Sequence, residues 1–158
     1  MKLISFDQAL GTTGYSIFEN GRLVYYNKFT TSNGETAIRL REFKDFINKL
    51  FDEYEPNKVC FEEIQLQNNV YNNVETFKKL AYVQAILMEA LEERGIPFEI
   101  ISSNTWKSFC NIKGRTRAEQ KKNAQLFVEE NYKIKVIQDI ADSICLGQCA
   151  LNREINWG

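Results

Sequence analysis

The sequence predicts an α/β fold in which helices flank a mixed five-stranded sheet. Three observations lead to this prediction. Five short apolar runs have the length of buried strands, a tight hairpin signal joins two of the early runs, and segments with helical spacing separate the later ones. A hairpin requires antiparallel strands, whereas strands that alternate with helices are typically parallel, so the sheet should contain both kinds of pairing.

The first part of the chain supplies three of these strands. Residues 2–7 are an apolar run that ends at Asp7, and residues 11–31 read as two further strands joined at Asn20-Gly21. Asn-Gly between apolar runs is the strongest short hairpin signal. Apolar residues at helical spacing then predict a helix over 36–54, which Pro56 stops.

The rest of the chain alternates strands and helices before ending in helices. Gly95-Ile96-Pro97 ends a long helix, and Ser103 or Asn104 is expected to cap a short one that runs through Phe109. The predicted elements after Pro56 are a strand over 58–64, a helix over 73–94, a strand over 97–102, the short helix to 109, a basic helix over 117–131 and a last helix over 137–151.

Length and composition favour an ordinary globular protein. The 158 residues are 44% apolar and 26% charged, enough for one domain over 1–158 with a substantial core. An acid at position 7 comes too early for a signal peptide, and no run approaches the roughly 20 apolar residues of a membrane helix. We therefore expect a soluble, intracellular protein with no membrane partner.

Cysteine and histidine usage narrows the chemistry. The four cysteines are scattered, form no CxxC motif and lie mostly in apolar segments, so we expect buried reduced thiols. The chain has no histidine, which excludes Ser-His and Cys-His catalysis and the usual catalytic zinc sites. Carboxylate and metal chemistry is the strongest remaining route.

Four carboxylates stand where such chemistry would need them. Asp7 and Glu62 close two apolar runs, and the carboxyl ends of parallel strands meet at one edge of a sheet. Asp139 and Asp142, three apart on the last helix, share one of its faces. Glu63 should point to the opposite sheet face. Burying such acids is costly without a cation, so the pattern indicates a metal-dependent nuclease.

Basic charge is concentrated in one segment although the net charge is −1. Residues 42–100 hold twelve acids and six bases, whereas residues 107–135 hold eight bases and three acids. A segment of that kind can follow DNA phosphates, although a solvated helix face would have the same composition. The eight bases are Lys107, Lys113, Arg115, Arg117, Lys121, Lys122, Lys133 and Lys135.

Several of these segments together resemble one family. SFDQALGTTGYSIFENGRL, VCFEEIQLQNN, ISSNTWKSFC, KGRTRAEQKKNAQ and DIADSICLG are similar, in order and spacing, to RuvC-type Holliday junction resolvases of the RNase H-like superfamily. The likeness covers nearly the whole chain and implies an RNase H-like fold. The compact length is similar to the phage-borne branch of the family, which implies the cytoplasm of a bacterial host cell.

The resemblance also implies an activity and its residues. Asp7, Glu62, Asp139 and Asp142 would hold two Mg²⁺ or Mn²⁺ ions, and Lys107 would lie near the scissile phosphate. Products would carry 5′-phosphates, the substrates would be Holliday junctions and other branched DNA in recombination, repair or replication, and the protein would be a homodimer. A second lysine of the family aligns near Arg117, with Lys113 and Lys121 as alternatives and Arg115 in the same DNA-contact cluster.

The chain departs from the resembled family at two places. Gln8 stands where the family usually has proline, which should change the turn but remove no metal ligand. Gln65 stands near the position of an aromatic residue implicated in opening junctions, and Tyr71 is the only nearby ring. Gln65 and Tyr71 are therefore candidate DNA contacts, and we expect junction opening to differ from that of cellular resolvases.

Two other classes of function remain to be compared. The GTTG segment after Asp7 is similar to the phosphate-binding start of sugar kinases and actin-like ATPases, but those proteins close over nucleotide with a second copy of the subdomain. A non-catalytic binder of branched DNA, or a structural protein whose acids are merely solvated, would need no metal site. The exposed side of the 73–94 helix, with Tyr82, Ile86 and Met88, is the candidate dimer contact, unless the helix is buried on both sides.

Overall fold

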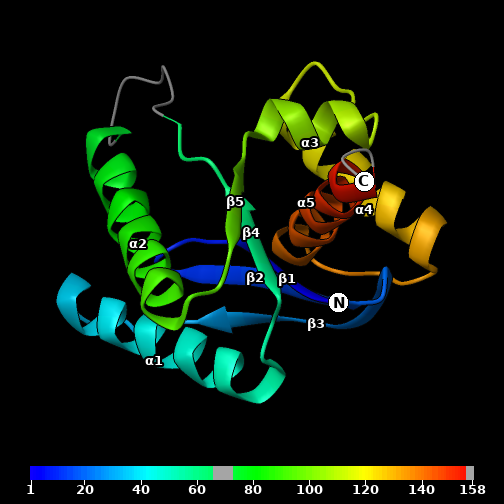
Figure 1. Ribbon diagram of the computed structural model, residues 1–158. Coiled ribbons are helices and arrows are strands. Elements are labelled where there is room, and N and C mark those ends of the chain that lie inside the picture. Colours follow the sequence, from blue (N-terminus) through cyan, green and yellow to red (C-terminus); the bar gives the residue numbers. More distant parts are fainter. Residues whose placement is uncertain (66–72, 156–158) are drawn as a thin grey trace.

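The computed structural model describes residues 1–65 and 73–155, and a five-stranded sheet lies at its centre. The strands follow the order β3-β2-β1-β4-β5, with β1 pairing antiparallel to β2 and parallel to β4 (Figure 1). The predicted mixed sheet is therefore confirmed. Its strands are β1 (Lys2–Asp7), β2 (Thr12–Glu19), β3 (Arg22–Thr30), β4 (Lys58–Glu62) and β5 (Phe98–Ile101).

The β2–β3 hairpin forms at the predicted Asn20-Gly21 turn. Both residues have positive φ, 52° and 81°, as a two-residue turn with matching strand twist requires. The amino group of Met1 donates to Asn20 Oδ1 at 2.6 Å, which ties the start of β1 to this turn.

Helices cover both faces of the sheet. On one face lie α1 (Thr36–Tyr54) and α2 (Asn73–Arg94), and on the other lie α3 (Ser103–Phe109), α4 (Arg117–Tyr132) and α5 (Gln138–Ile155), as Figure 1 shows. Two separate apolar clusters result, one under each layer of helices. No helix in the described part of the chain is long and apolar enough to cross a membrane.

Strand alternation decides which side chains of β1 and β4 enter which cluster. Ile4 and Phe6 of β1 pack toward α1 and α2, whereas Leu3 packs toward α5. In β4, Phe61 packs on the same side as Ile4 and Phe6, and Cys60 packs on the same side as Leu3. Because side chains alternate with a period of two, Asp7 and Glu62 belong to the face that α5 covers.

Helix α5 packs on β2 through contacts that recur at regular intervals along both elements. Gly14 lies against the backbone of Asp139, where a Cβ atom would come within 2.0 Å of the Asp139 carbonyl oxygen. Ser16 Oγ donates to the Ser143 carbonyl at 3.0 Å. Phe18 then packs where Gly147 has no side chain. Every second residue of β2 thus meets every fourth residue of α5, which fixes the helix along and across the sheet.

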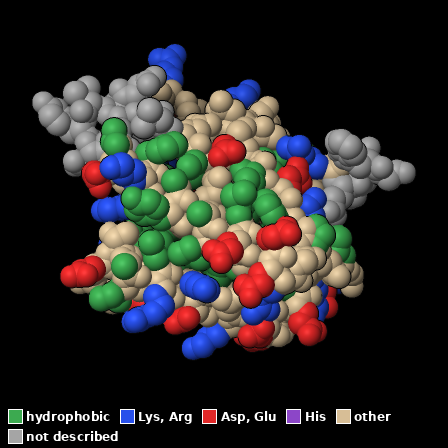
Figure 2. Space-filling model, turned by 60° about the vertical axis from the view of Figure 1, so that its left-hand side comes forward, with side chains coloured by type: hydrophobic (Ala, Val, Ile, Leu, Met, Phe, Trp, Pro, Cys, Tyr) green, Lys and Arg blue, Asp and Glu red, His purple; other side chains and the backbone are tan. Residues whose placement is uncertain are grey.

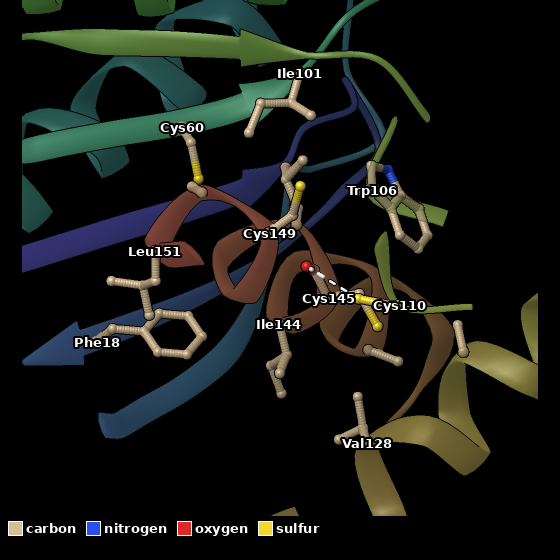
Figure 3. Packing of buried hydrophobic residues seen from close by; sticks show 14 of the residues in the cluster. Phe18, Cys60, Ile101, Trp106, Cys110, Val128, Ile144, Cys145, Cys149 and Leu151 are labelled. Atoms are coloured by element: carbon tan, nitrogen blue, oxygen red, sulfur yellow. Dashed lines mark hydrogen bonds between the residues drawn. The ribbon is translucent and has the colours of Figure 1, made fainter. Parts of the chain in front are cut away.

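The thiols are buried and free, as predicted. All four cysteines, Cys60, Cys110, Cys145 and Cys149, lie in the core cluster to which α5 contributes. Figure 3 shows Cys110 beside Cys145, whose carbonyl accepts from the Cys110 thiol at 3.6 Å. Burial raises the pKa of Cys60 to about 12, so this thiol stays protonated at neutral pH.

Some predicted boundaries were wrong by a few residues. Ser102, and not Ser103 or Asn104, caps α3, since its hydroxyl accepts from the Thr105 N–H at 3.2 Å. Strand β4 ends at Glu62, and α5 continues to Ile155. The last difference has a simple cause, because Leu151 at the predicted end is still buried in the core and the helix must continue past it.

Candidate active site

A cleft of about 620 Å³ opens at the carboxyl ends of β1 and β4, bounded by α2, α3, α4 and α5. Both acids and cations line it. All four predicted carboxylates and three of the predicted cations are among its lining residues. These seven are Asp7, Glu62, Asp139, Asp142, Lys107, Arg117 and Lys121.

Asp7 and Glu62 reach the cleft because parallel pairing and strand alternation place them together. The β1–β4 pairing runs from Leu3 opposite Lys58 to Phe6 opposite Phe61, so Asp7 and Glu62 follow directly at the same edge. Glu63, one residue further, is exposed at the rim and its carboxylate accepts from the N–H of Ile64 at 3.0 Å. Of the two neighbouring glutamates, Glu62 and not Glu63 is the one whose charge acts on Asp7.

Asp139 and Asp142 enter from the first turns of α5. Gly14 is paired with Asp7 in the sheet and also touches the backbone of Asp139, so one small residue brings the start of α5 next to the end of β1. Asp142 follows three residues later on the same side of the helix. Segments more than 130 residues apart in sequence thus contribute acids to one cleft.

Burial and mutual repulsion dominate the electrostatics of the acids. The pKa of Asp7 is raised well above its ordinary value by burial and by the charges of Asp142, Glu62 and Asp139, in that order. Burial first, and then Glu62, raises the pKa of Asp142 to about 7, against the lowering effect of Lys107. Burial also raises the pKa of Glu62, opposed by Lys107. Perturbation of this kind in a cleft is typical of a functional site.

The cations reach the cleft from two helices. Lys107 of α3 lies 5.5 Å from the Trp106 ring centre and donates to Gln120 Oε1 at 3.2 Å. Arg117 and Lys121, four residues apart on α4, present their side chains on one face of that helix. Lys107 and Arg117 lower the pKa of Glu62, and Lys121 lowers that of Asp142.

The remaining predicted DNA contacts lie outside this core. Lys113 and Arg115 are exposed in the loop between α3 and α4 and do not line the cleft. Gln65 is exposed and does line it. Tyr71 lies outside the described residues.

The donor set of the cleft fits a hard divalent cation. Carboxylate oxygens are the ligands that Mg²⁺ and Mn²⁺ prefer, and unrelieved repulsion among the acids is what a cation would remove. In residues 1–65 and 73–155, however, no three acids are already drawn close enough to ligate one ion together. Asp7, Glu62, Asp139 and Asp142 are thus the residues that would hold metal, with small side-chain movements to close around it.

Sequence reasoning missed three polar or aromatic residues of the cleft. Gln8 is buried and bonds to the backbone of Glu62, and Gln120 holds Lys107. Trp106 is buried, and its indole Nε1 has no hydrogen-bond partner at bonding distance in the described structure, although it lies close enough to Glu62 to lower that pKa. Trp106 stands beside Lys107 in the sequence, which was the one signal for it. Gln8 was noted only as a departure at the turn after Asp7, and nothing local marked Gln120.

This fold and cleft define a class of protein: a nuclease with an RNase H-like fold whose acids meet at the edge of a mixed sheet. Similarity to known proteins makes the class specific. A family model described as crossover junction endodeoxyribonuclease RuvC matches residues 3–150. The chain belongs to this family, and it is an endodeoxyribonuclease that cleaves DNA junctions.

Individual relatives agree over almost the full chain. The crossover junction endodeoxyribonuclease RuvC of Dictyoglomus turgidum is 29% identical over 154 residues, covering 92% of this chain and 93% of that protein. The RuvC of Geobacter sulfurreducens is 24% identical over 162 residues, covering 98% and 94%.

Solved structures show the same fold. The structure of T. thermophilus RuvC in complex with Holliday junction substrate has a TM-score of 0.77 at 16% identity, covering 98% of this chain and 96% of that one. The complex of Fowlpox virus resolvase with Holliday junction DNA has a TM-score of 0.64 at 15% identity, covering 98% and 99%. The predicted RNase H-like architecture is confirmed by these structures.

Proposed function

We propose that this protein resolves four-way DNA junctions, and cuts related branched DNA, by metal-dependent hydrolysis at the cleft described above. Asp7, Glu62, Asp139 and Asp142 hold two Mg²⁺ or Mn²⁺ ions. When bound, the ions supply an activated water and stabilise the leaving 3′ oxygen, so the products carry 5′-phosphates and 3′-hydroxyls. A chain with no histidine can hydrolyse DNA in this way.

The cations of the cleft act on the phosphate. Lys107, held by Gln120, directs its ammonium group toward the space between the acids and α4, where it neutralises charge that develops on the scissile phosphate. Arg117 and Lys121 contact adjacent phosphates and fix the register of the strand. Lys113, Arg115, Gln65 and Tyr71 extend the contact beyond the cleft.

One observation carries this proposal: the four acids, which come from distant parts of the sequence, line one cleft together with three cations. The test is to incubate pure protein with labelled four-way, three-way and linear duplex DNA, with and without Mg²⁺. We expect Mg²⁺-dependent cutting of branched DNA and intact linear duplex. Junction binding without any cutting in Mg²⁺ or Mn²⁺ would instead identify a non-catalytic binder.

We also propose that the protein acts as a homodimer through the outer side of α2, because symmetric cutting of a junction needs two active sites. Tyr82 and Met88 are 45% and 38% exposed there, so the helix is not buried on both sides. Ile86 is half-buried against the α1–α2 core and contributes less surface. Figure 2 shows hydrophobic side chains gathered on the side of the molecule that carries this helix.

Sedimentation at micromolar concentration tests the dimer. We expect the mass of two chains for the native protein and of one chain for Tyr82→Glu or Met88→Glu, because a charge in an apolar contact costs more than the contact gains. Leu126→Glu is the matched control, since Leu126 is 43% exposed on α4. A native protein that sediments as one chain would contradict the preformed dimer. A bacterial cytoplasm as its location and a phage as its source stay predictions.

A further inference from the structure

Gln8 holds Glu62 by its backbone. The Gln8 side chain is only 5% exposed and follows Asp7 directly at the end of β1. Its amide Nε2 donates to the Glu62 carbonyl at 2.7 Å, and its Oε1 accepts from the Glu62 N–H at 3.3 Å. One side chain therefore satisfies both polar backbone groups of an acid that is 54 residues away.

These two bonds extend the contact between β1 and β4. The paired residues of the two strands end at Phe6 and Phe61, and the Gln8 side chain bonds to β4 one residue beyond that last pair. A carboxamide carries the same donor and acceptor as a peptide group, and Gln8 thereby continues the ladder by one step with its side chain. On the other side of β4, the N–H of Glu63 donates to the Ile101 carbonyl at 2.9 Å.

The consequence concerns the distance between two carboxylates. Asp7 and Glu62 are the last residues of their strands, and strand ends fray unless something ties them together. Because Gln8 is bonded covalently to Asp7 and by two hydrogen bonds to Glu62, it couples the two acids directly. Without it, the Glu62 N–H and C=O would lie half-buried without those partners and the end of β4 would be free to move.

We propose that Gln8 is a positioning residue that sets the separation of the Asp7 and Glu62 carboxylates for metal binding. This inference rests on the proposed metal site, on which Gln8 acts through the backbone of Glu62. Residues that orient metal ligands through hydrogen bonds change metal affinity by about 10- to 100-fold when they are removed. Loss of Gln8 should therefore weaken metal binding by at least about tenfold.

Gln8→Met is the principal test, since methionine matches the length of glutamine but makes neither bond. Gln125→Met is the matched control, because Gln125 Nε2 also donates to a backbone carbonyl, that of Val136, at 3.0 Å, but lies outside the cleft. Binding of Mn²⁺ to the protein without DNA would be measured by calorimetry and by electron paramagnetic resonance. We expect about tenfold weaker binding for Gln8→Met and native affinity for Gln125→Met.

Cleavage provides a second readout. In Gln8→Met the Mn²⁺ concentration for half-maximal cutting should rise by a similar factor, while the rate at saturating Mn²⁺ recovers toward the native rate. A variant that was only less stable would lower the amount of active enzyme without moving the half-maximal concentration. Circular dichroism and melting without metal would establish that the variant is folded. Should Gln8→Met fail to fold, Gln8→Asn serves instead, since it keeps the amide but withdraws it by one methylene.

Asp7→Asn separates the two ways in which this inference can fail. If Asp7→Asn loses Mn²⁺ binding while folded Gln8→Met or Gln8→Asn binds with native affinity, the role of Gln8 is wrong and the metal site stands. If Asp7→Asn binds Mn²⁺ as the native protein does, the metal site itself is wrong. Weakened binding in both Gln8→Met and Asp7→Asn, with Gln125→Met unchanged, supports both.

Discussion

The two walls of the cleft are held in place by different means. The acid wall is built from β1, β4 and α5, and buried contacts to the backbone fix it: Gly14 against Asp139, and Ser16 to the carbonyl of Ser143. The basic wall is built from α3, α4 and the loop between them. Trp106, Ala124 and Val128 anchor its helices in the core, and side-chain bonds hold its cations. Lys107 to Gln120, at 3.2 Å, is one of these.

The two walls should therefore tolerate different amounts of movement in their side chains. Acids that share metal ions must be placed to within fractions of an ångström, because ligation at about 2.1 Å leaves little freedom. Phosphate contacts by long cationic side chains tolerate more movement, since their attraction acts over several ångströms. The acid wall should therefore control the chemical step and the basic wall the affinity for DNA.

The strongest test replaces one acid. Asp7→Asn should abolish cleavage and leave junction binding largely intact, because ligands act at the chemical step whereas phosphate contacts dominate affinity. Glu62→Gln and Asp142→Asn should do the same. Asp139→Asn should be the mildest, since Asp139 exerts the weakest of the three charge effects on Asp7. Near-native, metal-dependent cutting of a four-way junction by Asp7→Asn would show that the acid wall is not the active site.

Gly14→Ala should damage the acid wall without touching a carboxylate. The new methyl group would meet the Asp139 carbonyl oxygen at 2.0 Å, so α5 must shift, at a cost of about 1–3 kcal/mol in the free energy of unfolding. Urea unfolding and cleavage assays would measure both effects. Gly34→Ala is the control, because its nearest neighbour would be Ser32 Oγ at 3.5 Å. Equal stability and activity of the two variants would contradict the tight α5 contact.

The sequence was sufficient for the parts of the acid wall that follow from local periodicity. Alternation along residues 2–7 and the chain order of strands and helices predicted that Asp7 and Glu62 would share an edge and a face. The spacing of Asp139 and Asp142 predicted their common helix face. Arg117 and Lys121 fell on the same predicted helix, although the sequence left them, with Lys113, as alternatives for one family lysine.

Long-range contacts were not predictable in this way. The contact of Gly14 with Asp139 joins residues 125 positions apart, and the bond of Gln8 to Glu62 spans 54. No local pattern encodes either pair, because each depends on the register of β1 with its neighbours and on the docking of α5. The charge count likewise could not show that Lys113 and Arg115 lie outside the cleft, since it records position along the chain and not the direction of a side chain.

The pH dependence tests the electrostatic side of the same wall. The pKa of Asp142 is raised from 3.8 to about 7, so the folded, metal-free protein holds a proton that the unfolded chain releases. The contribution of Asp142 to the free energy of unfolding should be full below about pH 4. This contribution should be lost as the pH rises from there through about 7. Mg²⁺ should reverse the loss, since metal binding requires the deprotonated acid and strengthens over the same range.

Urea unfolding between pH 5 and pH 8, with and without Mg²⁺, would measure this. Asp142→Asn should show a smaller dependence on pH, because its side chain does not titrate. A native, metal-free protein whose stability increased steadily from pH 5 to pH 8 would contradict the raised pKa values of the acids.

The smallest expected effect concerns the basic wall. Neutralising Lys107, Arg117 and Lys121 to Gln in an Asp7→Asn background should weaken junction binding and flatten its salt dependence. Each lost phosphate contact reduces the slope of log K against log salt by about 0.9, so three contacts would change it by at most about 2.7. The charge-matched control is Lys28, Lys44 and Lys49 to Gln, three exposed lysines outside the cleft.

Fluorescence anisotropy with a labelled junction at several salt concentrations would give both slopes. A flatter slope in the cleft variant alone means that the basic wall contacts phosphates, whereas equal slopes in the two variants mean that net charge alone accounts for the change. An unchanged slope in the cleft variant would show that these cations form only a solvated surface. In that case the assignment of chemistry to the acid wall and of DNA affinity to the basic wall would fail for the basic wall, because DNA would be held elsewhere on the molecule.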